Sequence, residues 1–584
     1  MKKEKKKSGY KQFLSRLMPY VKPHRVTFFF SVLFDFIAIL LNMLIPICTG
    51  KAIDCMLTAG SVNFELLIIM CVTIFILTAV NSLFDWLGSV YMNKLTYLTA
   101  QSIRNSIYKK LNTVPIKYID NKSHGDIMNT MVVDVENVTD GFLEGFKAIM
   151  CGIFQVAIVL VMMFVLNWTL ALIVVVMAPV SLWVAIKITK KSKELYRKRV
   201  NEQGAMSGYA EEMITNMKII KAFNNEKAVN KKFEDINQQL YTSSEKSLYY
   251  ASLAHPASRM VNNILYAVVG VVGGVMAING GISIGKISSF LSYSENFTKP
   301  FNEVAGIFAD LHVAVASANR VFNLLDEQDE ISDEDLPELK KCNGNVSIKH
   351  VDFSYSKAFK LIEDFNLEVE QGNRIAIVGP TGCGKSTLIN LLMRFYDVDA
   401  GSIKVSNKDI RKVKRNSFRQ FYGMVLQESW LYNASVKDNV VYAKPDASMD
   451  EIIEACKLAN AHDFIQKLPQ GYDTIISERG DNISAGQKQL LCIARIMLLK
   501  PPMLILDEAT SNIDTRTEMI IQSALDKIME GRTCFIIAHR LSTIENADKI
   551  LVMNKGQIVE TGTHQELLEK AGFYAELFNS QFGN

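Results

Sequence analysis

The sequence predicts a protein of two parts, a six-helix transmembrane bundle followed by an α/β domain that carries a phosphate-binding loop (P-loop). The chain has 584 residues, which is too long for one soluble core. Apolar stretches long enough to cross a bilayer recur in its first half. In its second half, the segment Gly379–Ser386 fits the pattern G-x-x-x-x-G-K-[ST]. The fold class is therefore multi-domain, with the membrane part first.

The composition excludes several other classes of protein. Hydrophobic residues make up 49% of the chain, and the long apolar runs lie in the first half. The net charge of +4 is small and gives no reason to expect a nucleic-acid partner. The nine cysteines are scattered without a C-x-x-C or metal-spaced cluster, so neither a disulfide framework nor a zinc site is indicated. The first apolar run is long enough to span a membrane, which does not fit a cleavable signal peptide.

Six stretches are candidate membrane spans, because about 20 mostly apolar residues cross a hydrocarbon core of roughly 30 Å. They are residues 27–48, 66–86, 147–167, 169–188, 257–279 and 287–310. The sixth contains three charged residues, and we count it because an even number of spans puts both ends of the chain on one side. A soluble helical bundle is the alternative, but Val156–Leu166 offers no polar face to water.

The connecting segments differ in charge. Those that carry few lysines or arginines are 49–65, 167–168 and 279–286, whereas 93–146, 189–255 and the N-terminus are rich in both. Since positively charged loops stay in the cytoplasm, we expect both termini, both long loops and the nucleotide domain on that side of a multi-pass cell-membrane protein. Each long loop resembles two helical extensions joined by a polar break, near residues 118–125 and 216–225. Such tips could contact a nucleotide domain and pass motion to it.

Charged residues inside the spans are candidates for a substrate pathway. Asp35 lies midway along the first span, while Glu295, Lys299 and Glu303 share one face of the sixth. Charges in a membrane are costly, and they face a cavity or a charged partner. The two interpretations are a pathway of acidic character and an internal ion pair that helps the helices pack. The sequence leaves both open.

The second half begins after the last span. Ala316–Asp326 is expected to extend that helix, and the acidic run Glu327–Pro337 has the composition of a solvated tether. A strand over Asn345–Ser354 begins the next domain. We therefore expect a transmembrane domain over residues 1–318, a linker over 319–343 and a nucleotide-binding domain over 344–584.

The phosphate-binding loop has the context that its function requires. An apolar strand, Arg374–Val378, precedes it, and a helix, Thr387–Met393, follows. Glycines let backbone N–H groups turn toward phosphate oxygens at a helix N-terminus. The predicted contacts are Gly379, Pro380, Thr381, Gly382, Cys383, Gly384, Lys385, Ser386 and Thr387. Among them, Lys385 brings a positive charge to the outer phosphates and Ser386 a hydroxyl that suits Mg²⁺.

Further motifs follow in a fixed order. They are Tyr355, Gln427 within Val425–Glu428, Ser477–Gly480, Ile483–Gln487, Met503–Glu508, Ser511–Asp514 and His539 within Ile537–Arg540. With them the chain resembles, over nearly its whole length, an exporter half-transporter of the ATP-binding cassette (ABC) family. The resemblance implies that ATP and Mg²⁺ are its cofactors. It also implies that a second half-transporter, membrane lipids and a small hydrophobic or amphipathic substrate are its partners.

The resemblance also assigns roles to residues. Tyr355 stacks on adenine, and Gln427 contacts Mg²⁺ and the membrane domain. The signature residues Ser484, Ala485, Gly486 and Gln487 close over the ATP of the partner, and Ser511 and Asp514 belong to the loop that crosses to it. His539 is the switch histidine.

The residue types suit phosphoryl transfer to water independently of the family, since that reaction needs charge neutralisation and a positioned nucleophile. Asp507 ends an apolar strand and can hold Mg²⁺ through its water shell. Glu508 can orient the attacking water or accept its proton, so it is the predicted catalytic base. His539, the second predicted catalytic residue, can contact the terminal phosphate.

The signature departs from the family twice, with Ile483 for leucine and Ala485 for glycine. A methyl group at Ala485 could crowd the approach to the partner's terminal phosphate, where glycine lets the backbone come close. Glu508 and His539 are intact. This pattern resembles the chain with the complete catalytic carboxylate in bacterial heterodimeric exporters, so we favour a heterodimer. The alternative is a homodimer that tolerates alanine.

The sequence therefore predicts an ATPase that drives export across the cytoplasmic membrane by alternating access. The expected cargo is a drug, a lipid or a small peptide. A lipid flippase of the same architecture is one alternative, and an ATP-gated channel or regulator is another.

Overall fold

The computed structural model describes residues 13–56, 62–355, 360–426, 429–477, 482–507, 514–538 and 541–582. They form two compact units. The first takes in the described residues up to Thr113 and from Lys122 to Glu327, and it is helical. The second takes in Val114–Asn121 and the described residues from Gln328 onward, and its main part is α/β. The predicted fold class, a transmembrane helical part followed by an α/β nucleotide-binding domain, is confirmed.

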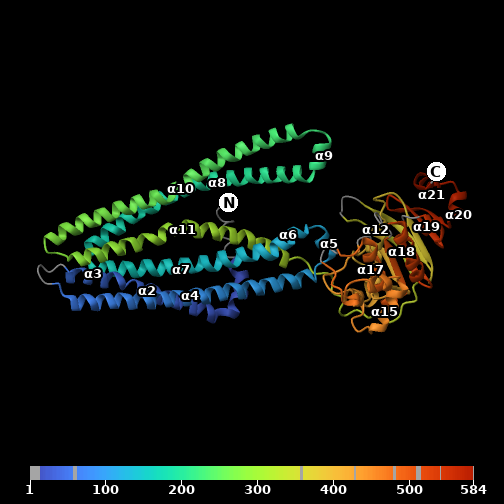
Figure 1. The fold of residues 1–584 in the computed structure, drawn as a ribbon, viewed down its shortest axis with the longest axis horizontal. Helices are drawn as coiled ribbons and strands as arrows, with labels where there is room; N and C mark the ends of the chain where they lie inside the picture. Colours follow the sequence, from blue (N-terminus) through green and yellow to red (C-terminus); the bar gives the residue numbers. More distant parts are fainter. Residues whose placement is uncertain are drawn as a thin grey trace. The chain divides into compact units, whose positions relative to one another are not determined.

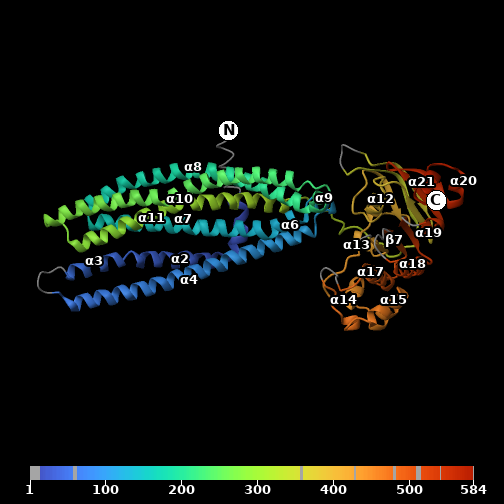
Figure 2. The same cartoon turned by 45° about the horizontal axis from the view of Figure 1, so that its top comes forward.

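The helical unit begins with a helix over residues 13–21. Its long helices are α2 (Arg25–Asn42), α3 (Ile45–Met56), α4 (Phe64–Leu111), α7 (Val135–Leu166), α8 (Trp168–Thr215), α10 (Glu226–Ile278) and α11 (Ile284–Leu325). Its short elements are the 3₁₀ turn η1 (Lys22–His24), α6 (His124–Asn129), the π-helical segment η2 (Thr130–Asp134) and α9 (Met217–Ala222). Helix α2 packs on α4, α7 on α11, and α8 on α10, as Figures 1 and 2 show.

Four helical stretches in the described part of the chain are long and apolar enough to cross a membrane. They are Phe13–Met56, Phe64–Leu111, His124–Leu166 and Arg259–Ile278, which correspond to the predicted first, second, third and fifth spans. The predicted fourth span lies in α8, which begins with the apolar stretch Trp168–Met177. The predicted sixth span lies within the unbroken helix α11.

The first span differs from the prediction, because it is interrupted. Helix α2 ends at Asn42 and α3 begins at Ile45. Pro46 lacks an N–H group, and its ring would clash with the carbonyl group four residues earlier, so one continuous helix is disfavoured. Two side chains of α11 satisfy carbonyl groups at this break. The buried Tyr293 hydroxyl donates to the carbonyl oxygen of Met43, and Ser289 donates to that of Pro46 at 2.7 Å.

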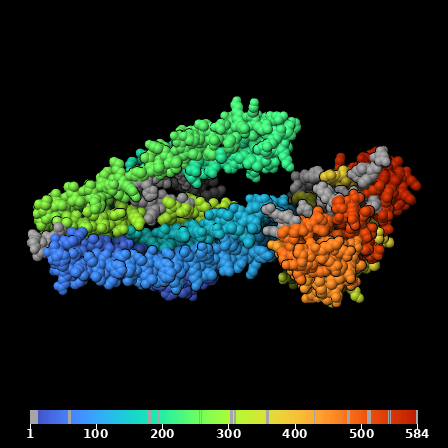
Figure 3. All heavy atoms as spheres, viewed as in Figure 1, coloured from blue at the N-terminus to red at the C-terminus, as the bar shows by residue number. Residues whose placement is uncertain are grey.

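The structure confirms that each long loop consists of two helical extensions. Helices α4 and α7 extend one loop, and α8 and α10 the other. The tips carry short helices that the sequence did not predict, α5 (Ile116–Asp120) and α6 in the first and α9 in the second. Helix α6 begins where the Ser123 hydroxyl accepts from the Asp126 N–H, which is an ordinary N-cap. Figures 1 and 3 show the hairpin of α8 and α10 diverging from the other helices toward α9.

A buried ion pair joins η2 to α11. Asp134 of η2 is fully buried, and Arg320 of α11 donates to its carboxylate through Nε at 2.7 Å. The Arg320 guanidinium also donates to Ser317 at 3.1 Å. Helix α11 continues to Leu325 with Asp326 as its C-cap, which agrees with the helical extension expected over Ala316–Asp326.

The second unit contains two sheets. An antiparallel sheet has the order β2-β1-β4-β5, and a larger sheet has the order β10-β9-β3-β8-β7-β6. The strands are β1 (Val346–Phe353), β2 (Ile362–Val369), β3 (Arg374–Val378), β4 (Ala400–Val405), β5 (Lys408–Asp409), β6 (Tyr422–Val425), β7 (Met503–Asp507), β8 (Thr533–Ile537), β9 (Lys549–Asn554) and β10 (Gln557–Gly562). Strands β9, β3, β8, β7 and β6 are parallel. Their nearly continuous apolar runs are typical of strands that are covered on both faces.

Helices cover this sheet and form a separate helical part. They are α12 (Lys385–Leu392), α13 (Arg415–Arg419), α14 (Val436–Val440), α15 (Met449–Leu458), α16 (His462–Gln466), α17 (Ala485–Leu499), α18 (Thr515–Met529), α19 (Leu541–Glu545), α20 (His564–Glu569) and α21 (Phe573–Phe582), with 3₁₀ turns η3 (Ile410–Lys412), η4 (Val441–Ala443) and η5 (Gly471–Asp473). Helix α12 follows β3 directly, as the sequence predicted for the helix after the phosphate-binding loop.

The acidic linker is not the solvated tether that its composition suggested. Asp333 accepts a hydrogen bond from the backbone N–H of Arg415 at 2.6 Å, and the Arg415 guanidinium donates to the carbonyl oxygen of Ile331 at 2.7 Å. Leu339 is 2% exposed. A buried guanidinium needs acceptors and counter-charges, and the linker supplies them.

A glycine in α4 sets the spacing between α2 and α4. A Cβ atom at Gly88 would lie 2.2 Å from Oδ1 of the buried Asp35. We expect Gly88→Ala to lower stability by about 1–3 kcal/mol, since the methyl group must displace a carboxylate that is held by Lys147. The readout is the apparent melting temperature of the purified protein in detergent. Gly270→Ala in α10 is the matched control, because a Cβ atom there meets no atom of the described residues within 4 Å. Equal melting temperatures for the two variants would contradict this account.

Candidate nucleotide-binding site

The predicted site residues follow the carboxyl ends of neighbouring parallel strands. Gly379 follows β3, and Asp507 is the last residue of β7. In an open parallel sheet these ends form one edge, which is where ligands bind. Gln427, Glu508, Ser511 and His539 lie outside the described residues. In the sequence they come shortly after β6, β7 and β8, the strands of the same edge.

Glycines give the phosphate-binding loop its shape. A Cβ atom at Gly379 would lie 2.2 Å from the carbonyl oxygen of Met553 in β9, so only glycine lets the loop pass so close to that strand. Gly384 is the N-cap of α12 and has φ of 106°, which glycine adopts without strain. The loop closes with hydrogen bonds from Cys383 N–H to Pro380 O at 3.2 Å and from Gly556 N–H to Cys383 O at 3.0 Å.

The polar groups of the loop are placed to meet an anion. The Lys385 ammonium group donates to the carbonyl oxygens of Gly379 at 2.7 Å and Pro380 at 3.1 Å, so it lies over the loop. Thr381, Gly382 and Ser386 are exposed, whereas Thr387 and Cys383 are buried. Burial raises the pKa of the Cys383 thiol, which keeps it neutral at physiological pH. The loop thus presents Lys385, Ser386 and the N-terminus of α12 together.

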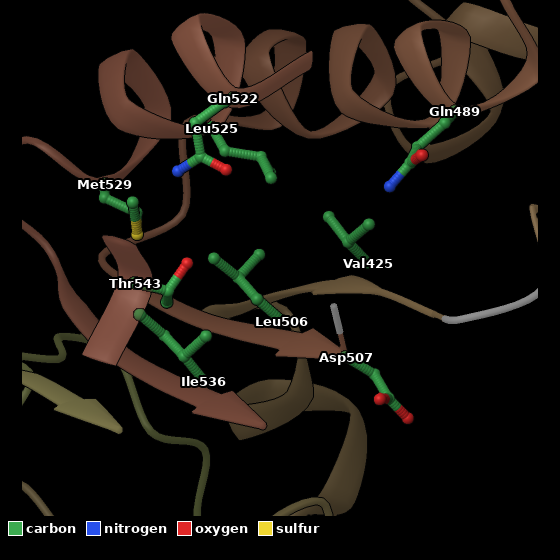
Figure 4. A pocket seen from close by; sticks show the side chains of 9 residues that line it. All are labelled: Val425, Gln489, Leu506, Asp507, Gln522, Leu525, Met529, Ile536 and Thr543. Carbon is green, nitrogen blue, oxygen red and sulfur yellow. The ribbon is translucent and has the colours of Figure 1, made fainter. Parts of the chain in front are cut away.

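Asp507 lies beside a small apolar cavity. The cavity has a volume of about 10 Å³ and is lined mainly by apolar side chains of β6, β7, β8 and α18, including Val425, Leu506 and Ile536. Figure 4 shows the carboxylate of Asp507 pointing away from these side chains. The apolar part of β7 therefore anchors the strand, and its last residue leaves the core.

Tyr355 is held by contacts with β1, with α12 and with Tyr396. Its hydroxyl donates to Thr387 Oγ1 at 3.3 Å and accepts from Asn390 Nδ2 at 3.3 Å. Its ring makes edge-to-face contacts with Phe353 and Tyr396, with centroid distances of 4.9 and 5.0 Å. The residue is 39% exposed, so part of the ring is available to a ligand.

The signature residues form the N-terminus of α17. The Ser484 hydroxyl accepts from Gln487 N–H at 3.2 Å, and the Gln487 side chain accepts from Ser484 N–H at 2.9 Å, which is a capping box. Ala485 is exposed and is the first residue of the helix, while Gly486 is buried. Alanine at this position is compatible with the helical backbone.

Asp514 has a structural role that the sequence did not suggest. It is the N-cap of α18, and its carboxylate accepts from Thr517 N–H at 2.9 Å. That hydrogen bond from the backbone of Thr517 lowers the pKa of Asp514. The carboxylate therefore stays ionised at the end of the segment 511–514.

These residues fit a nucleoside triphosphate with Mg²⁺. The glycine loop leaves room for phosphate oxygens close to the backbone, and Lys385 adds a cation. The Ser386 hydroxyl and the Asp507 carboxylate are hard oxygen donors of the kind that Mg²⁺ prefers. Bound Mg²⁺ would supply charge neutralisation between the outer phosphates.

The charged residues predicted for a substrate pathway have different surroundings. Asp35 is 4% exposed, and its Oδ1 atom lies 3.2 Å from Nζ of Lys147 in α7. Lys147 also approaches Ser89 Oγ at 3.5 Å. Glu295 and Lys299 are exposed on α11, and the side chain of Glu303 lies outside the described residues. Lys147 was not among the predicted pathway residues, although a lysine at the edge of an apolar span was a usable signal.

One cavity in the helical unit carries negative charge. It has a volume of about 230 Å³ and lies between α7 and α11. Its lining residues are Asn137, Asp140, Gly141, Glu144, Gly145, Asp310 and Val313. No sequence pattern singled out these carboxylates, because they lie on two helices that meet only in the folded unit.

The comparisons with known proteins agree in both halves. The family described as "ABC transporter transmembrane region" matches residues 28–301, and that described as "ABC transporter" matches residues 362–511. A "fatty acid ABC transporter ATP-binding/permease protein" of Mycobacterium bovis is 39% identical over 85% of this chain and 78% of its own length. A putative multidrug export ATP-binding/permease protein of Staphylococcus aureus is 36% identical over 97% of this chain and all of its own.

A Bacillus subtilis protein named as an uncharacterised ABC transporter ATP-binding protein is 36% identical over the whole of this chain and 96% of its own length. Among solved structures, a bacterial Atm1-family ABC exporter with ATP bound is similar. It superposes with a TM-score of 0.77 at 28% identity, covering 96% of this chain and all of that one.

Proposed function

We propose that this chain exports hydrophobic or amphipathic compounds across the cytoplasmic membrane. The chain belongs to the ABC transporter family, as an exporter half-transporter whose ATPase is coupled to transport. The observation that supports this proposal most directly is that helices long enough to span a membrane and a phosphate-binding loop on a parallel sheet occur in one chain. Export by ATP-driven transport follows from the family, while the cargo class, the partner and the residue roles below are proposals.

At the nucleotide site, Tyr355 stacks on adenine, and the loop from Gly379 to Thr387 holds the phosphates. Ser386, Asp507 and Gln427 hold Mg²⁺. Glu508 orients the attacking water and accepts its proton, and His539 contacts the terminal phosphate. The apolar strand β7, which delivers Asp507 to the edge of the sheet, supports this assignment, because Glu508 is the next residue.

For the cargo, the names of two relatives support the proposed class, since one refers to fatty acids and the other to multidrug export. The acidic cavity between α7 and α11 supports cationic members of that class, because carboxylates attract cations and repel anions. Asp35 is buried against Lys147, so Glu295 and Lys299, which are exposed on α11, are the better pathway candidates.

Two alternatives remain distinct from a drug pump. A lipid flippase differs only in cargo. An ATP-gated channel would pass its solute down a gradient while ATP is bound and Glu508 is blocked, whereas a pump would not. A flux assay with Glu508→Gln in liposomes separates a channel from both pumps.

The partner is a second half-transporter. The tip of the second long loop supports this, since Ile219 and Phe223 at α9 are 57% and 79% exposed. Exposed apolar side chains at the end of a long hairpin are costly without a partner surface. We favour a different chain over a second copy because of Ala485. The helix at this position is undistorted, so any effect of the methyl group falls on the ATP of the partner.

In this proposal both termini of the chain lie in the cytoplasm.

The partner can be identified directly. We expect affinity purification of the tagged chain from its native membrane to recover a second half-transporter at equal stoichiometry, as mass spectrometry would reveal. Glu508→Gln in this chain alone should lower ATP hydrolysis by about 100-fold or more, since it removes the proton acceptor. Recovery of this chain alone, as an active pair, would establish a homodimer instead.

Ala485 provides a second test of asymmetry. We expect Ala485→Gly to raise the turnover of the purified complex, because the variant relieves crowding at the ATP of the partner. The relative gain should be largest when Glu508 is replaced by glutamine, since the small residual hydrolysis then comes from the partner's site. An unchanged rate in both backgrounds would make Ala485 a neutral variation.

Asp35 separates a pathway role from a packing role. We expect Asp35→Asn to lower basal ATP hydrolysis and ethidium export together, because Lys147 loses its counter-ion. Breaking a fully buried pair costs about 3–5 kcal/mol, and less is expected here because the Lys147 side chain is 21% exposed. The double variant Asp35→Asn/Lys147→Gln should recover part of both activities. Loss of ethidium export with unchanged basal hydrolysis would instead assign Asp35 to the pathway.

A further inference from the structure

Four residues after α12 form a segment that several elements hold in place. We call Arg394–Asp397 the junction segment. Arg394 has φ of 51°, and its buried guanidinium donates to the carbonyl oxygen of Ile410 and to the Asp397 carboxylate, both at 2.8 Å. Arg419 lies over the Phe395 ring, 5.2 Å from its centroid, and donates to Arg394 O at 2.7 Å. The backbone of the segment is thus fixed by two arginines.

Tyr396 of the junction segment contacts two functional elements at once. Its ring lies edge-to-face with that of Tyr355 at an angle of 87°. Its hydroxyl donates to Asp120 Oδ2 at 2.6 Å. Asp120 is the last residue of α5, the tip of the first long loop, and residues 114–121 belong to the second unit. Burial and the hydrogen bond to Asp120 raise the pKa of Tyr396, so its hydroxyl remains a donor at any physiological pH.

The acidic linker supports the junction segment through one buried arginine. The side chain of Arg415 is 6% exposed. Its guanidinium lies 3.2 Å from Glu330 and 3.5 Å from Asp333 on the linker, and 3.9 Å from Asp397 on the junction segment. Its Nε and Nη2 atoms have no hydrogen-bond partner among the described residues, so these carboxylates compensate them by charge. Freeing the linker would therefore leave a buried cation beside Asp397.

We propose that Tyr396 is a positioning residue that links the adenine-stacking aromatic Tyr355 to the loop tip at Asp120, and that the linker holds it in place through Arg415. The proposal rests on the proposed function, since it takes Tyr355 as the residue that stacks on adenine.

The contacts around Tyr355 explain how ligand binding at its ring is transmitted to α5. Its hydroxyl is bound to Thr387 and Asn390 of α12, and its ring edge meets Tyr396. A ligand that fixes the Tyr355 ring therefore restrains Tyr396, and the Tyr396 hydroxyl restrains α5. Because such coupling is reciprocal, docking of α5 should also favour the ATP-bound state of the site.

The test uses the full transporter with its partner, in nanodiscs, with Glu508→Gln to retain ATP. Hydrogen exchange of the amides in residues 114–121 is measured with and without ATP and Mg²⁺, and ATP affinity is measured in parallel. In the parent we expect ATP to slow exchange of this segment. The absence of that effect in the parent would overturn the proposal.

Tyr396→Phe removes only the hydroxyl and keeps the ring against Tyr355. We expect the slowing of exchange by ATP to fall by roughly tenfold, the value of a hydrogen bond to a charged acceptor. ATP affinity should fall by no more than the same factor, because the coupling is reciprocal and the ring against Tyr355 remains. Tyr472→Phe is the matched control, since it removes a hydroxyl of η5 that contacts His462 of α16 at 2.8 Å. Retained protection in Tyr396→Phe would overturn the proposal.

The linker variant Glu330→Gln/Asp333→Asn tests the support through Arg415. These partly exposed carboxylates can be neutralised with less risk to folding than the buried arginine. We expect faster exchange of residues 328–337 and reduced protection of 114–121 by ATP. Unchanged protection of 114–121 would refute the role of the linker.

Tyr355→Ala separates this proposal from the one on which it rests. Unchanged ATP affinity in Tyr355→Ala would refute the assignment of Tyr355 to adenine. Weakened ATP binding in that variant, together with full protection in Tyr396→Phe, would refute the positioning role alone.

Discussion

The close approach of the phosphate-binding loop to β9 fixes the nucleotide half of this protein. Because no Cβ atom fits between Gly379 and the Met553 carbonyl oxygen, the loop lies directly against the sheet, and α12 starts at a set place on its edge. The parallel pairing of β3 with β8, and of β7 with β8 and β6, then brings the segments after these strands to that edge. One steric constraint and one pairing pattern thus arrange residues that are more than 100 positions apart.

Three buried charges among the described residues are paired in the same way. Asp35 is paired with Lys147, Asp134 with Arg320, and Arg415 with the linker carboxylates. In each case the partners come from different elements, because a buried charge needs a counter-ion that packing brings to it. These pairs define where helices and linker meet, whereas apolar contacts alone would leave the register of long helices less determined. They also show why charged residues in a span are ambiguous in sequence, since packing and transport use the same side chains.

The two long loops end differently within this one chain. The first has a tip, α5, that belongs to the nucleotide unit and accepts a hydrogen bond from Tyr396. The second ends at α9 with exposed apolar side chains. ABC exporters work as dimers, and under the proposed function the exposed tip at α9 is the one available to the partner. The junction segment then lies where nucleotide site, loop tip and linker meet.

The sequence by itself determined the fold class, the phosphate-binding loop and the helical extensions, because each depends on local pattern: apolar length, glycine spacing and periodicity. It missed the break at Pro46, the partner of Asp35 and the anchored linker, where distant residues decide the outcome. Tyr293 satisfies a carbonyl group at the break. Arg415 is paired with a carboxylate of the acidic run, so this run is held in place and serves as a counter-charge. No sequence pattern singled out Tyr396, because its role depends on the hydrogen bond to Asp120, which is 276 residues away. Only the tertiary structure decides such pairs, because hydrogen bonds and ion pairs depend on which side chains folding brings within a few ångströms of each other.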